Sequence, residues 1–205
     1  MSGVFTIETL RDMIASALEA VTEHCSELST LDSATGDGDH GTAICQAMKA
    51  VNDSVQQATE LKSALKDMGF AAMMQSCGST STLIGAFFLG MSEAVEGDEL
   101  SPAEVSAMFA SGLANVRRQT KADLGDKTMM DALIPAVTGL EESQADGLAA
   151  MFSRAADEAA AGARKTVDMV ARFGRARNLG ERVIGHADAG AASMAYMFQA
   201  FAKVL

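Results

Sequence analysis

The chain has 205 residues, a formal net charge of −11 at pH 7 and 48% hydrophobic residues, but no Trp, one Tyr and two Pro. This length suits one domain, residues 1–205, with a substantial core, and the abundant Ala and Met favour packed helices over a sheet. The acidic balance argues against nucleic acid as a partner, because contacts to its phosphates need Lys and Arg. An anionic substrate would have to be bound by metal ions or by local backbone dipoles.

Neither a targeting segment nor a membrane-spanning segment is expected. Residues 1–20 lack the basic start and apolar run of a signal peptide, and the longest apolar run, 83–91, is too short to span a bilayer. The cysteines Cys25, Cys45 and Cys77 are odd in number and lack metal-ligand spacing. We expect reduced thiols, packed as small core residues of a cytoplasmic protein that binds no membrane. Cys77 lies near a candidate site, but a role as nucleophile is disfavoured.

The first half of the chain alternates helical patterns with glycine-rich or polar segments. Apolar residues at three- and four-residue steps predict one helix over about 6–28. A second helix is expected from residue 41 into the fifties, and a third over 61–75. The polar run 76–82 then precedes the very apolar stretch 83–89, which we expect to form a buried helix.

The second half continues in the same way. Ser101-Pro102-Ala103-Glu104 combines a capping box with Pro at the first helical position. Helices are expected over about 102–118, 130–137, 147–171 and 191–204, with loops at 121–128, 141–146 and 173–190. The pattern thus predicts an all-α bundle of about eight helices without a strand. Because alternate connections of an antiparallel bundle lie at the same end, several of these loops can build one site.

The loop 31–42 carries the strongest chemical signal. Gly36, Gly38 and Gly41 satisfy the spacing G-x-G-x-x-G, but no strand precedes them, as the dinucleotide fingerprint requires. Asp37 and Asp39 at variable positions of this motif would repel a bare pyrophosphate. Divalent cations between them would remove the conflict, and Mg²⁺ binds through a few carboxylates plus substrate phosphates. The loop is therefore interpreted as a binding site for a metal-bridged phosphate at a helix N-terminus.

Two other interpretations of this loop are weaker. An EF-hand calcium loop beginning at Asp37 would have Gly41 at its fifth position and Met48 at its twelfth, where oxygen ligands are needed. A plain surface turn is compatible with Asp and Gly. It does not account for Asp32, which offers a third carboxylate five residues before Asp37.

Two further segments are candidates for anion binding. Residues 78–82 are five small residues, four of them hydroxylic, ahead of a buried helix. Helix capping is the alternative, although one cap uses one hydroxyl. In the tail, Arg175, Arg177 and Arg182 concentrate cations, and we expect Arg177 at the surface and at least one of the others on a phosphate. Asp188 is either a helix N-cap or a nucleotide contact.

Four blocks of sequence together resemble a known family. In chain order they are Leu31–Asp32 with Gly36–Gly41, Gly85–Phe88, Gly125–Met129, and Gly174–Ala176 with Leu179–Arg182 and Gly185–His186. With them the chain resembles the L subunit, the nucleotide-binding half, of dihydroxyacetone kinase. The resemblance implies an antiparallel barrel of eight α-helices, with a nucleotide and two Mg²⁺ held by loops at one end.

The resemblance also implies roles for particular residues. Asp32, Asp37 and Asp39 would ligate the two magnesium ions. The site for ADP or ATP would comprise His40, Gly41, Thr42, Ala43, Gly78, Ser79, Thr80, Met129, Arg175, Asp188, Ala189 and Gly190. No residue is expected to act as a covalent catalyst, because phosphoryl transfer depends on metal ions and positioning.

In the family, this subunit works with a K subunit that holds the ketose on its own histidine. In one branch ADP is a retained cofactor, recharged by a phosphohistidine protein of the phosphotransferase system; in the other, ATP is an exchanging substrate. The first branch is the prediction here, and a homodimer is compatible with it. The alternatives are an ATP-dependent kinase subunit for another ketose such as erythrulose, a nucleotide-loaded regulatory subunit without turnover, and a helical scaffold without ligand.

The chain departs from the family pattern at three places. The family's glycine-rich loop usually reads close to Gly-Gly-Ala-Ser-Gly-Pro, whereas residues 77–82 read Cys-Gly-Ser-Thr-Ser-Thr. Thr120 stands where Gly is common, and the turn Asp188-Ala189-Gly190 replaces Asp-Pro-Gly. These changes leave the predicted metal site intact, but they leave open which ketose, partner and phosphoryl donor are used.

Overall fold

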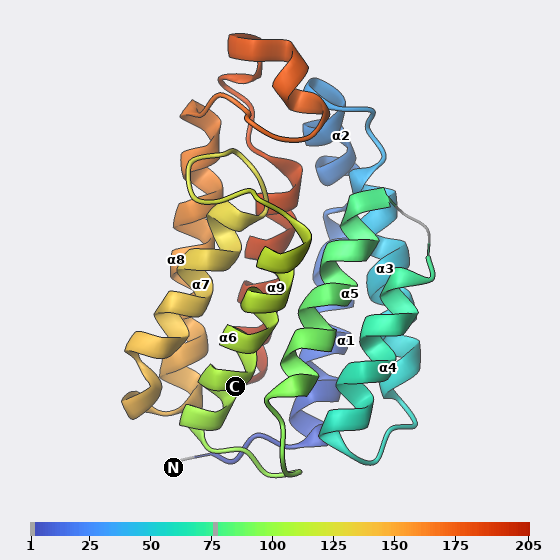
Figure 1. The fold of residues 1–205 in the computed structure, drawn as a ribbon, viewed down its shortest axis with the longest axis vertical. Helices are drawn as coiled ribbons and strands as arrows, with labels where there is room; N and C mark the ends of the chain where they lie inside the picture. Colours follow the sequence, from blue (N-terminus) through green and yellow to red (C-terminus); the bar gives the residue numbers. More distant parts are fainter. Residues whose placement is uncertain (1–2, 76–77) are drawn as a thin grey trace.

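The computed structural model describes residues 3–75 and 78–205, and this part of the chain is almost entirely helical (Figure 1). Its elements are α1 (Ile7–Glu23), α2 (Cys25–Thr35), α3 (His40–Val55), α4 (Leu61–Met73), α5 (Gly78–Glu93), α6 (Pro102–Gln119), α7 (Met130–Glu142), η1 (Gln144–Asp146), α8 (Leu148–Lys165), η2 (Thr166–Asp168), η3 (Arg175–Val183) and α9 (Ala189–Val204). The β-type pairing found within these ranges is one isolated bridge, between Phe5 and Leu100. The all-α prediction is confirmed.

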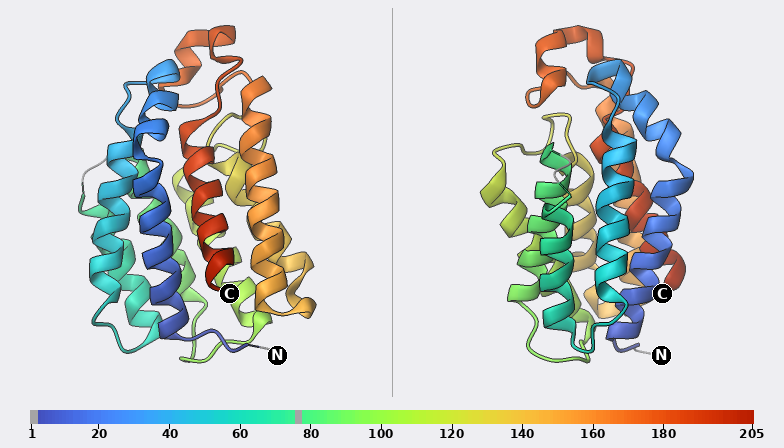
Figure 2. Two further views of the ribbon diagram at one scale, coloured as in Figure 1. Left: turned by 180° about the vertical axis from the view of Figure 1, so that it is seen from behind. Right: turned by 90° about the vertical axis from the view of Figure 1, so that its right-hand side faces the viewer.

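Eight of these helices close into a barrel. Each packs on the next in the ring α1, α3, α4, α5, α6, α7, α8, α9, and α9 packs back on α1. Neighbours in the ring run in opposite directions (Figures 1 and 2). The ninth helix, α2, lies at one end of the barrel and packs on α3 and α9. The predicted antiparallel arrangement of about eight helices is therefore confirmed, with α2 as an addition. None of the described helices is both long and apolar enough to cross a membrane.

The helix predicted over 6–28 is in fact two helices. His24, with φ −94° and ψ 10°, separates α1 from α2. The second helix then continues to Thr35, so Asp32 lies in a helix and not in the loop that follows. The apolar pattern could not reveal this, because α2 buries only Leu28 and Thr35 and has almost no apolar stripe.

Two other expectations need correction. The helix predicted over 147–171 ends at Lys165, where the chain turns away through η2 and the Thr166 carbonyl accepts a hydrogen bond from the Lys127 side chain. Cys25 and Cys45 are free thiols, but they are half-buried and not core residues. Burial raises the pKa of the Cys45 thiol to about 11. Cys77 lies outside the described residues.

The helix start predicted at Ser101 is confirmed. The Ser101 hydroxyl accepts the backbone N–H of Glu104, and the Glu104 carboxylate accepts the backbone N–H of Ser101 at 2.8 Å. Two N–H donors at the start of the helix are thereby satisfied. This helix begins at the end of the barrel opposite to α2, together with α4 and α8 (Figure 1).

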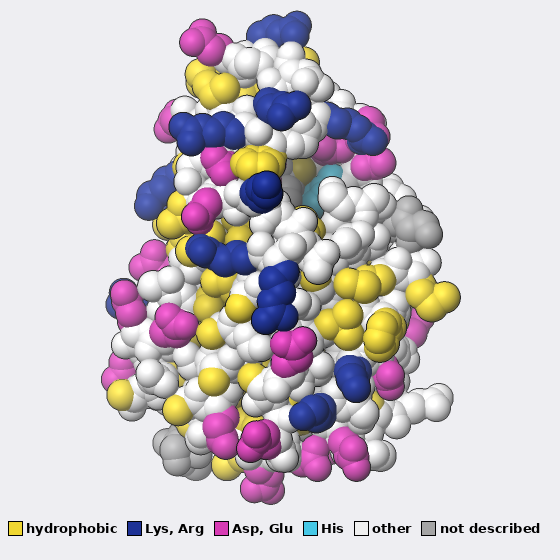
Figure 3. All heavy atoms as spheres, viewed as in Figure 1, with side chains coloured by type: hydrophobic (Ala, Val, Ile, Leu, Met, Phe, Trp, Pro, Cys, Tyr) yellow, Lys and Arg dark blue, Asp and Glu magenta, His cyan; other side chains and the backbone are white. Residues whose placement is uncertain are grey.

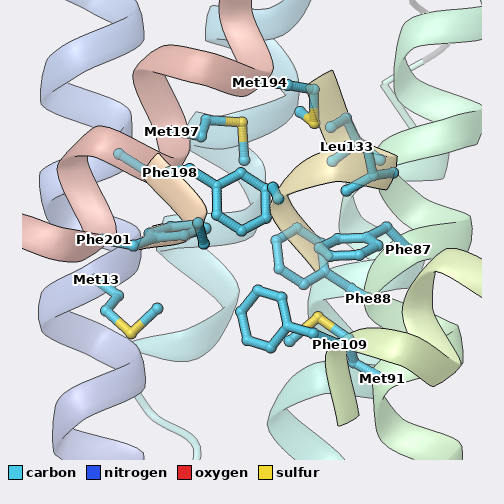
Figure 4. Packing of buried hydrophobic residues seen from close by; sticks show 14 of the residues in the cluster. Met13, Phe87, Phe88, Met91, Phe109, Leu133, Met194, Met197, Phe198 and Phe201 are labelled. Carbon is cyan, nitrogen blue, oxygen red and sulfur yellow. The ribbon is translucent and has the colours of Figure 1, made fainter. Parts of the chain in front are cut away.

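Phenylalanine rings fill the middle of the barrel (Figure 4). The Phe109 ring centroid of α6 lies 5.8 Å from that of Phe87 on α5 and 5.4 Å from that of Phe152 on α8, both edge to face. Phe198 and Phe201 of α9 approach the same ring at 6.0 and 6.4 Å. Such pairs contribute roughly 0.5–1.5 kcal/mol each beyond the burial of their area. The barrel thus has a packed core, and space for a ligand lies at its ends.

Helices α7 and α8 approach each other closely at Gly162. Pro135 has no N–H, so the carbonyl of Asp131, four residues earlier, lacks its usual helical donor. Gly162 of α8 packs against this carbonyl, and a Cβ at residue 162 would lie 1.9 Å from the Asp131 oxygen. Only glycine allows this contact, which fixes the first turn of α7 at the loop end of the barrel.

We therefore expect Gly162→Ala to lower the free energy of unfolding by about 2–3 kcal/mol, the cost of overpacking a closed interface. Urea unfolding followed by circular dichroism measures it. Gly139→Ala is the matched control in the same interface, because its new Cβ would meet Ala155 atoms at 3.4 Å, an ordinary contact. Gly139→Ala should leave the free energy of unfolding unchanged or raise it by up to about 1 kcal/mol through helix propensity. An equal loss of stability in both variants would contradict the special role of Gly162 in the contact with Asp131.

Candidate functional site

A cavity of about 450 Å³ opens at the end of the barrel where α3, α5, α7 and α9 begin. Figure 3 shows Lys and Arg side chains gathered at this end, around a recess in which a histidine is visible. Twelve of the fifteen predicted site residues line the cavity: Asp32, Asp37, Asp39, His40, Gly78, Ser79, Thr80, Met129, Arg175, Asp188, Ala189 and Gly190. They come from stretches far apart in the sequence, which the fold brings together at the loop end of the barrel.

Three carboxylates form an acidic cluster at the rim of the cavity. Oxygen atoms of Asp32, Asp37 and Asp39 lie within 4.8 Å of one another. Asp32, in the last turn of α2, accepts the backbone N–H groups of Gly38 at 2.8 Å, Asp39 at 3.0 Å and His40 at 3.3 Å. These bonds tie the end of α2 to the start of α3 and fix the loop between them.

Arg175 of η3 forms an ion pair with Asp37. The guanidinium group reaches the acidic cluster from a segment that lies far away in sequence, and both side chains are exposed. Exposed pairs of this kind contribute about 0–1 kcal/mol, because water and salt screen them. The pair therefore places a cation beside the cluster without fixing it there strongly.

His40 joins α5 and α9 at the start of α3. Its Nε2 lies 3.0 Å from the Ser193 hydroxyl, which donates to the Gly190 carbonyl at 2.9 Å. Its Nδ1 lies 3.3 Å from the Thr80 hydroxyl. Burial lowers the pKa of His40, and the neighbouring Asp32 and Asp39 oppose this effect. A neutral imidazole with its proton on Nε2 satisfies both contacts, with Ser193 as acceptor and Thr80 as donor.

The other three predicted residues do not line the cavity. Gly41 packs against α2, where a Cβ would lie 2.0 Å from the Cys25 carbonyl oxygen. The Thr42 side chain is exposed, and Ala43 is buried, with its N–H bonded to the Asp39 carbonyl at 2.9 Å. Their side chains thus stay outside the cavity, and what they offer to it is the backbone of the first turn of α3.

Residues 78–82, the small residues predicted as a second anion-binding site, lie at the start of α5. The Ser81 and Thr82 hydroxyls bond the Gly78 carbonyl, each at 3.2 Å. Of the four hydroxylic residues, Ser79 and Thr80 line the cavity. The preceding residues 76 and 77 lie outside the described part of the chain.

The floor and one wall of the cavity are apolar. Ile84 of α5, Met130 of α7 and Met194 of α9 lie one turn closer to the loops than the phenylalanine cluster. Met129 and Phe173 add to the wall. The cavity therefore has a polar, charged mouth and an apolar interior, a division suited to a ligand with an anionic end and a flat apolar part.

Residues with buried charges hold the loop 125–128, and no pattern in the sequence predicted their role. Asp131, 2% exposed, accepts the N–H of Gly125 at 2.6 Å and that of Thr128 at 2.9 Å. Lys127, which is also buried, lines the cavity. Burial lowers the pKa of Lys127, and the nearby Asp188 opposes this effect. The sequence feature that could have identified Lys127 is its place in a short polar loop directly before a buried helix.

Asp188 has the first of the two roles that the sequence left open, that of helix N-cap. Its carboxylate caps α9 by accepting the Ala191 N–H at 2.8 Å, and it also lines the cavity. Burial raises its pKa to about 7, although the capping bond and Lys127 act in the opposite direction. A carboxyl in this position changes charge near neutral pH.

A family model described as the DAK2 domain matches residues 34–203. The chain belongs to the DAK2 domain family. The match includes the acidic cluster except Asp32, and it extends through the loops around the cavity to α9.

Individual relatives agree with this assignment. The DAK2 chain is 36% identical over 200 residues to the Listeria innocua "PEP-dependent dihydroxyacetone kinase 2, ADP-binding subunit DhaL", covering 94% of this chain and 90% of the relative. It is 32% identical over 197 residues to the "D-erythrulose kinase" of Mycolicibacterium smegmatis, covering 89% of this chain and 33% of that relative. The crystal structure of the C. freundii dihydroxyacetone kinase "in complex with AMP-PNP and Mg2+" matches with a TM-score of 0.73 at 24% identity, covering 94% of this chain and 33% of that chain. This structural likeness shows a shared fold.

We expect stability to depend on the charge of Asp188. Because its pKa is higher in the folded protein than the ordinary 3.8, its ionisation opposes folding, and the wild type loses stability as pH rises from about 4 through about 7. Asp188→Asn keeps an N-cap but cannot ionise. In metal-free urea unfolding the variant should match the wild type near pH 4 and exceed its stability at pH 8 by on the order of 1 kcal/mol. A stability difference between Asp188→Asn and the wild type that stays constant from about pH 4 to pH 8 would contradict the raised pKa of Asp188.

Proposed function

We propose that this chain is the Mg-nucleotide-binding subunit of a short-chain ketose kinase, with dihydroxyacetone as the acceptor, and that it acts with a separate K subunit that holds the ketose. The observation that carries the proposal is the acidic cluster at the mouth of a cavity into which the first turns of four helices point. Clustered carboxylates alone would repel a nucleotide, and helix N-termini alone would not select a metal-bound one. Together they suit a phosphate tail bridged by cations.

The acidic cluster fits magnesium. Mg²⁺ prefers hard oxygen ligands and usually takes one or two carboxylates together with phosphates and waters. Asp32, Asp37 and Asp39 supply carboxylate oxygens close enough to be shared between two ions. Magnesium, when bound, neutralises charge on the phosphates and on the transferring group. The ligand roles of these aspartates and the number of two ions are part of the proposal.

The phosphate tail would lie against the first turns of α3 and α5. The backbone of Gly41, Thr42 and Ala43 supplies the dipole of α3, and Ser79 with Thr80 supplies hydroxyls at the start of α5. His40 positions the Thr80 hydroxyl. Arg175, beside Asp37, is placed to pair with a phosphate oxygen.

The nucleoside would occupy the apolar interior of the cavity. Met129 and Phe173 present apolar surface on the side of α7 and the 166–188 connection, and the Asp188–Gly190 turn forms the adjoining edge. A volume of about 450 Å³ is in the range of small-molecule sites. This arrangement supports ADP or ATP as the ligand.

The chemistry needs no protein nucleophile. Phosphoryl transfer is catalysed mainly by positioning and by electrostatic stabilisation of charge on the transferring group. The chain's residues would orient the nucleotide's terminal phosphate towards the mouth, where the ketose of the K subunit approaches. The relative named as an ADP-binding subunit of a PEP-dependent kinase supports ADP as a retained cofactor, recharged by a phosphohistidine protein of the phosphotransferase system.

A second candidate is an ATP-dependent kinase subunit for erythrulose, which the named D-erythrulose kinase relative supports. Mass spectrometry of the gently purified protein separates the two donors: retained ADP favours the phosphohistidine route, and a nucleotide-free protein that exchanges ATP favours the other. Transfer assays with the cognate K subunit and each ketose then test the activity. Full Mg-ADP occupancy without transfer from any donor would defeat the kinase proposal and favour a regulatory subunit.

We expect Asp37→Asn to weaken Mg-dependent ADP binding at least about tenfold, or about 1.4 kcal/mol, because a metal-binding carboxylate is lost. Helical content should not change, since Asp37 is exposed. Isothermal titration calorimetry with ADP, with and without Mg²⁺, measures the effect. Asp53→Asn, an exposed acid near the far end of α3, is the matched control and should bind like the wild type. Equal affinity of Asp37→Asn and wild type would show the ligand assignment to be mistaken.

A further inference from the structure

The segment 167–187 leaves the barrel after α8, lies beyond the loop end of the barrel and returns at α9 (Figures 1 and 2), and Phe173–Ala176 within it line the cavity. Its two ends lie side by side. The Gly185 N–H donates to the Val167 carbonyl at 2.8 Å, and the Asp188 N–H donates to the Thr166 hydroxyl at 2.9 Å. The segment is therefore a loop closed at its base, and the base lies directly beside the cavity.

A single ammonium group joins the two ends of this loop. Lys127 Nζ donates to the carbonyls of Thr166 and His186, each at 2.5 Å. The lysine is 2% exposed, and a buried ammonium is stable only when it is hydrogen-bonded and near compensating charge. The two carbonyls provide the bonds, and Asp131 and Asp188 provide the nearby negative charge.

The backbone around this lysine is strained in a way that favours a functional role. Among the described non-glycine residues Lys127 alone has a positive φ, of 60°. Left-handed backbone is unfavourable for a residue with a long side chain, and it persists where the surroundings fix it, often at binding sites. Here Asp131 fixes it by holding Gly125 and Thr128, on either side of Lys127.

We propose that Lys127 is a positioning residue of the cavity: by bridging Thr166 and His186 it holds the loop 167–187, with Arg175, over the ligand. The consequence for binding rests on the proposed nucleotide site, whereas the bridge itself does not. Two of the three ammonium protons are used by the carbonyls, so the lysine acts on the ligand through the loop it anchors. A lysine that instead bound phosphate directly would leave the loop unchanged when removed.

Lys127→Met in the full-length chain tests the proposal, because Met keeps much of the side-chain volume and removes the donors. Hydrogen exchange measured by mass spectrometry without ligand should show amides of 167–187 exchanging at least about tenfold faster, with α4 and α5 unchanged. Calorimetry should show Mg-ADP affinity reduced at least about tenfold. Unchanged exchange in 167–187 would overturn the proposal, whatever happens to affinity.

Two controls separate positioning from general stability. Lys121→Met removes a lysine charge from an exposed position in the connection between α6 and α7, which also contains Lys127. This variant should leave both the hydrogen exchange of 167–187 and the Mg-ADP affinity unchanged. Val105→Ala, a core change in the first turn of α6 at the opposite end, should lower the melting temperature without weakening Mg-ADP binding. If Val105→Ala and Lys127→Met have the same melting temperature and weaken Mg-ADP binding equally, the positioning role of Lys127 is refuted.

A third variant covers the case in which Lys127→Met does not fold. Thr166→Val keeps the carbonyl that Lys127 binds but removes the hydroxyl that accepts the Asp188 N–H. It should increase exchange in 167–187 to a smaller extent, and unchanged exchange there would count against a closed base. Should the wild type fail to bind Mg-ADP, the proposed function fails, and the exchange measurements still decide the role of Lys127.

Discussion

Alternating helix direction around a closed ring is the constraint on which the rest of the structure depends. It brings the N-termini of α3, α5, α7 and α9 to one end, with the positive ends of their dipoles around one cavity. The protein as a whole carries a formal charge of −11. The helix dipoles at the cavity therefore oppose the charge of the protein as a whole, and Lys127 and Arg175 add two cations to the cavity lining.

The acidic cluster at the mouth adds a second requirement. Three carboxylates with oxygens within 4.8 Å repel one another unless a cation lies between or beside them. Asp32 is held by three backbone N–H groups, whereas Asp37 and Asp39 are exposed and Asp37 pairs with Arg175. In the proposed site, an anion at the helix N-termini and cations at the carboxylates would each reduce the electrostatic cost of the other. Metal and nucleotide binding should accordingly be coupled.

The sequence predicted the parts of this site that depend on side-chain type. The aspartates, the hydroxylic residues and the arginines of the tail have unusual local composition, and the family resemblance selected Arg175 among these arginines. Outside the site, the capping box at Ser101 was predicted from its fixed spacing. The break at His24 could not be predicted, because α2 has almost no apolar stripe. The bond from Lys127 to the Thr166 carbonyl at the end of α8 and the contact of Gly41 with the Cys25 carbonyl join residues far apart in the sequence, and periodicity does not encode such contacts.

The residues missed at the sequence level share a physical role. Glycine-rich loops have few apolar side chains to bury, so they cannot be fixed by the hydrophobic effect that fixes the helices. Buried polar groups hold them instead: Asp131 binds the N–H groups of the 125–128 loop, and Lys127 binds carbonyls at both ends of the 167–187 loop. Such groups contribute little net stability, but leaving one of them unpaired is costly. They therefore fix one geometry of the loops, and a site that acts by positioning needs that property more than it needs stability.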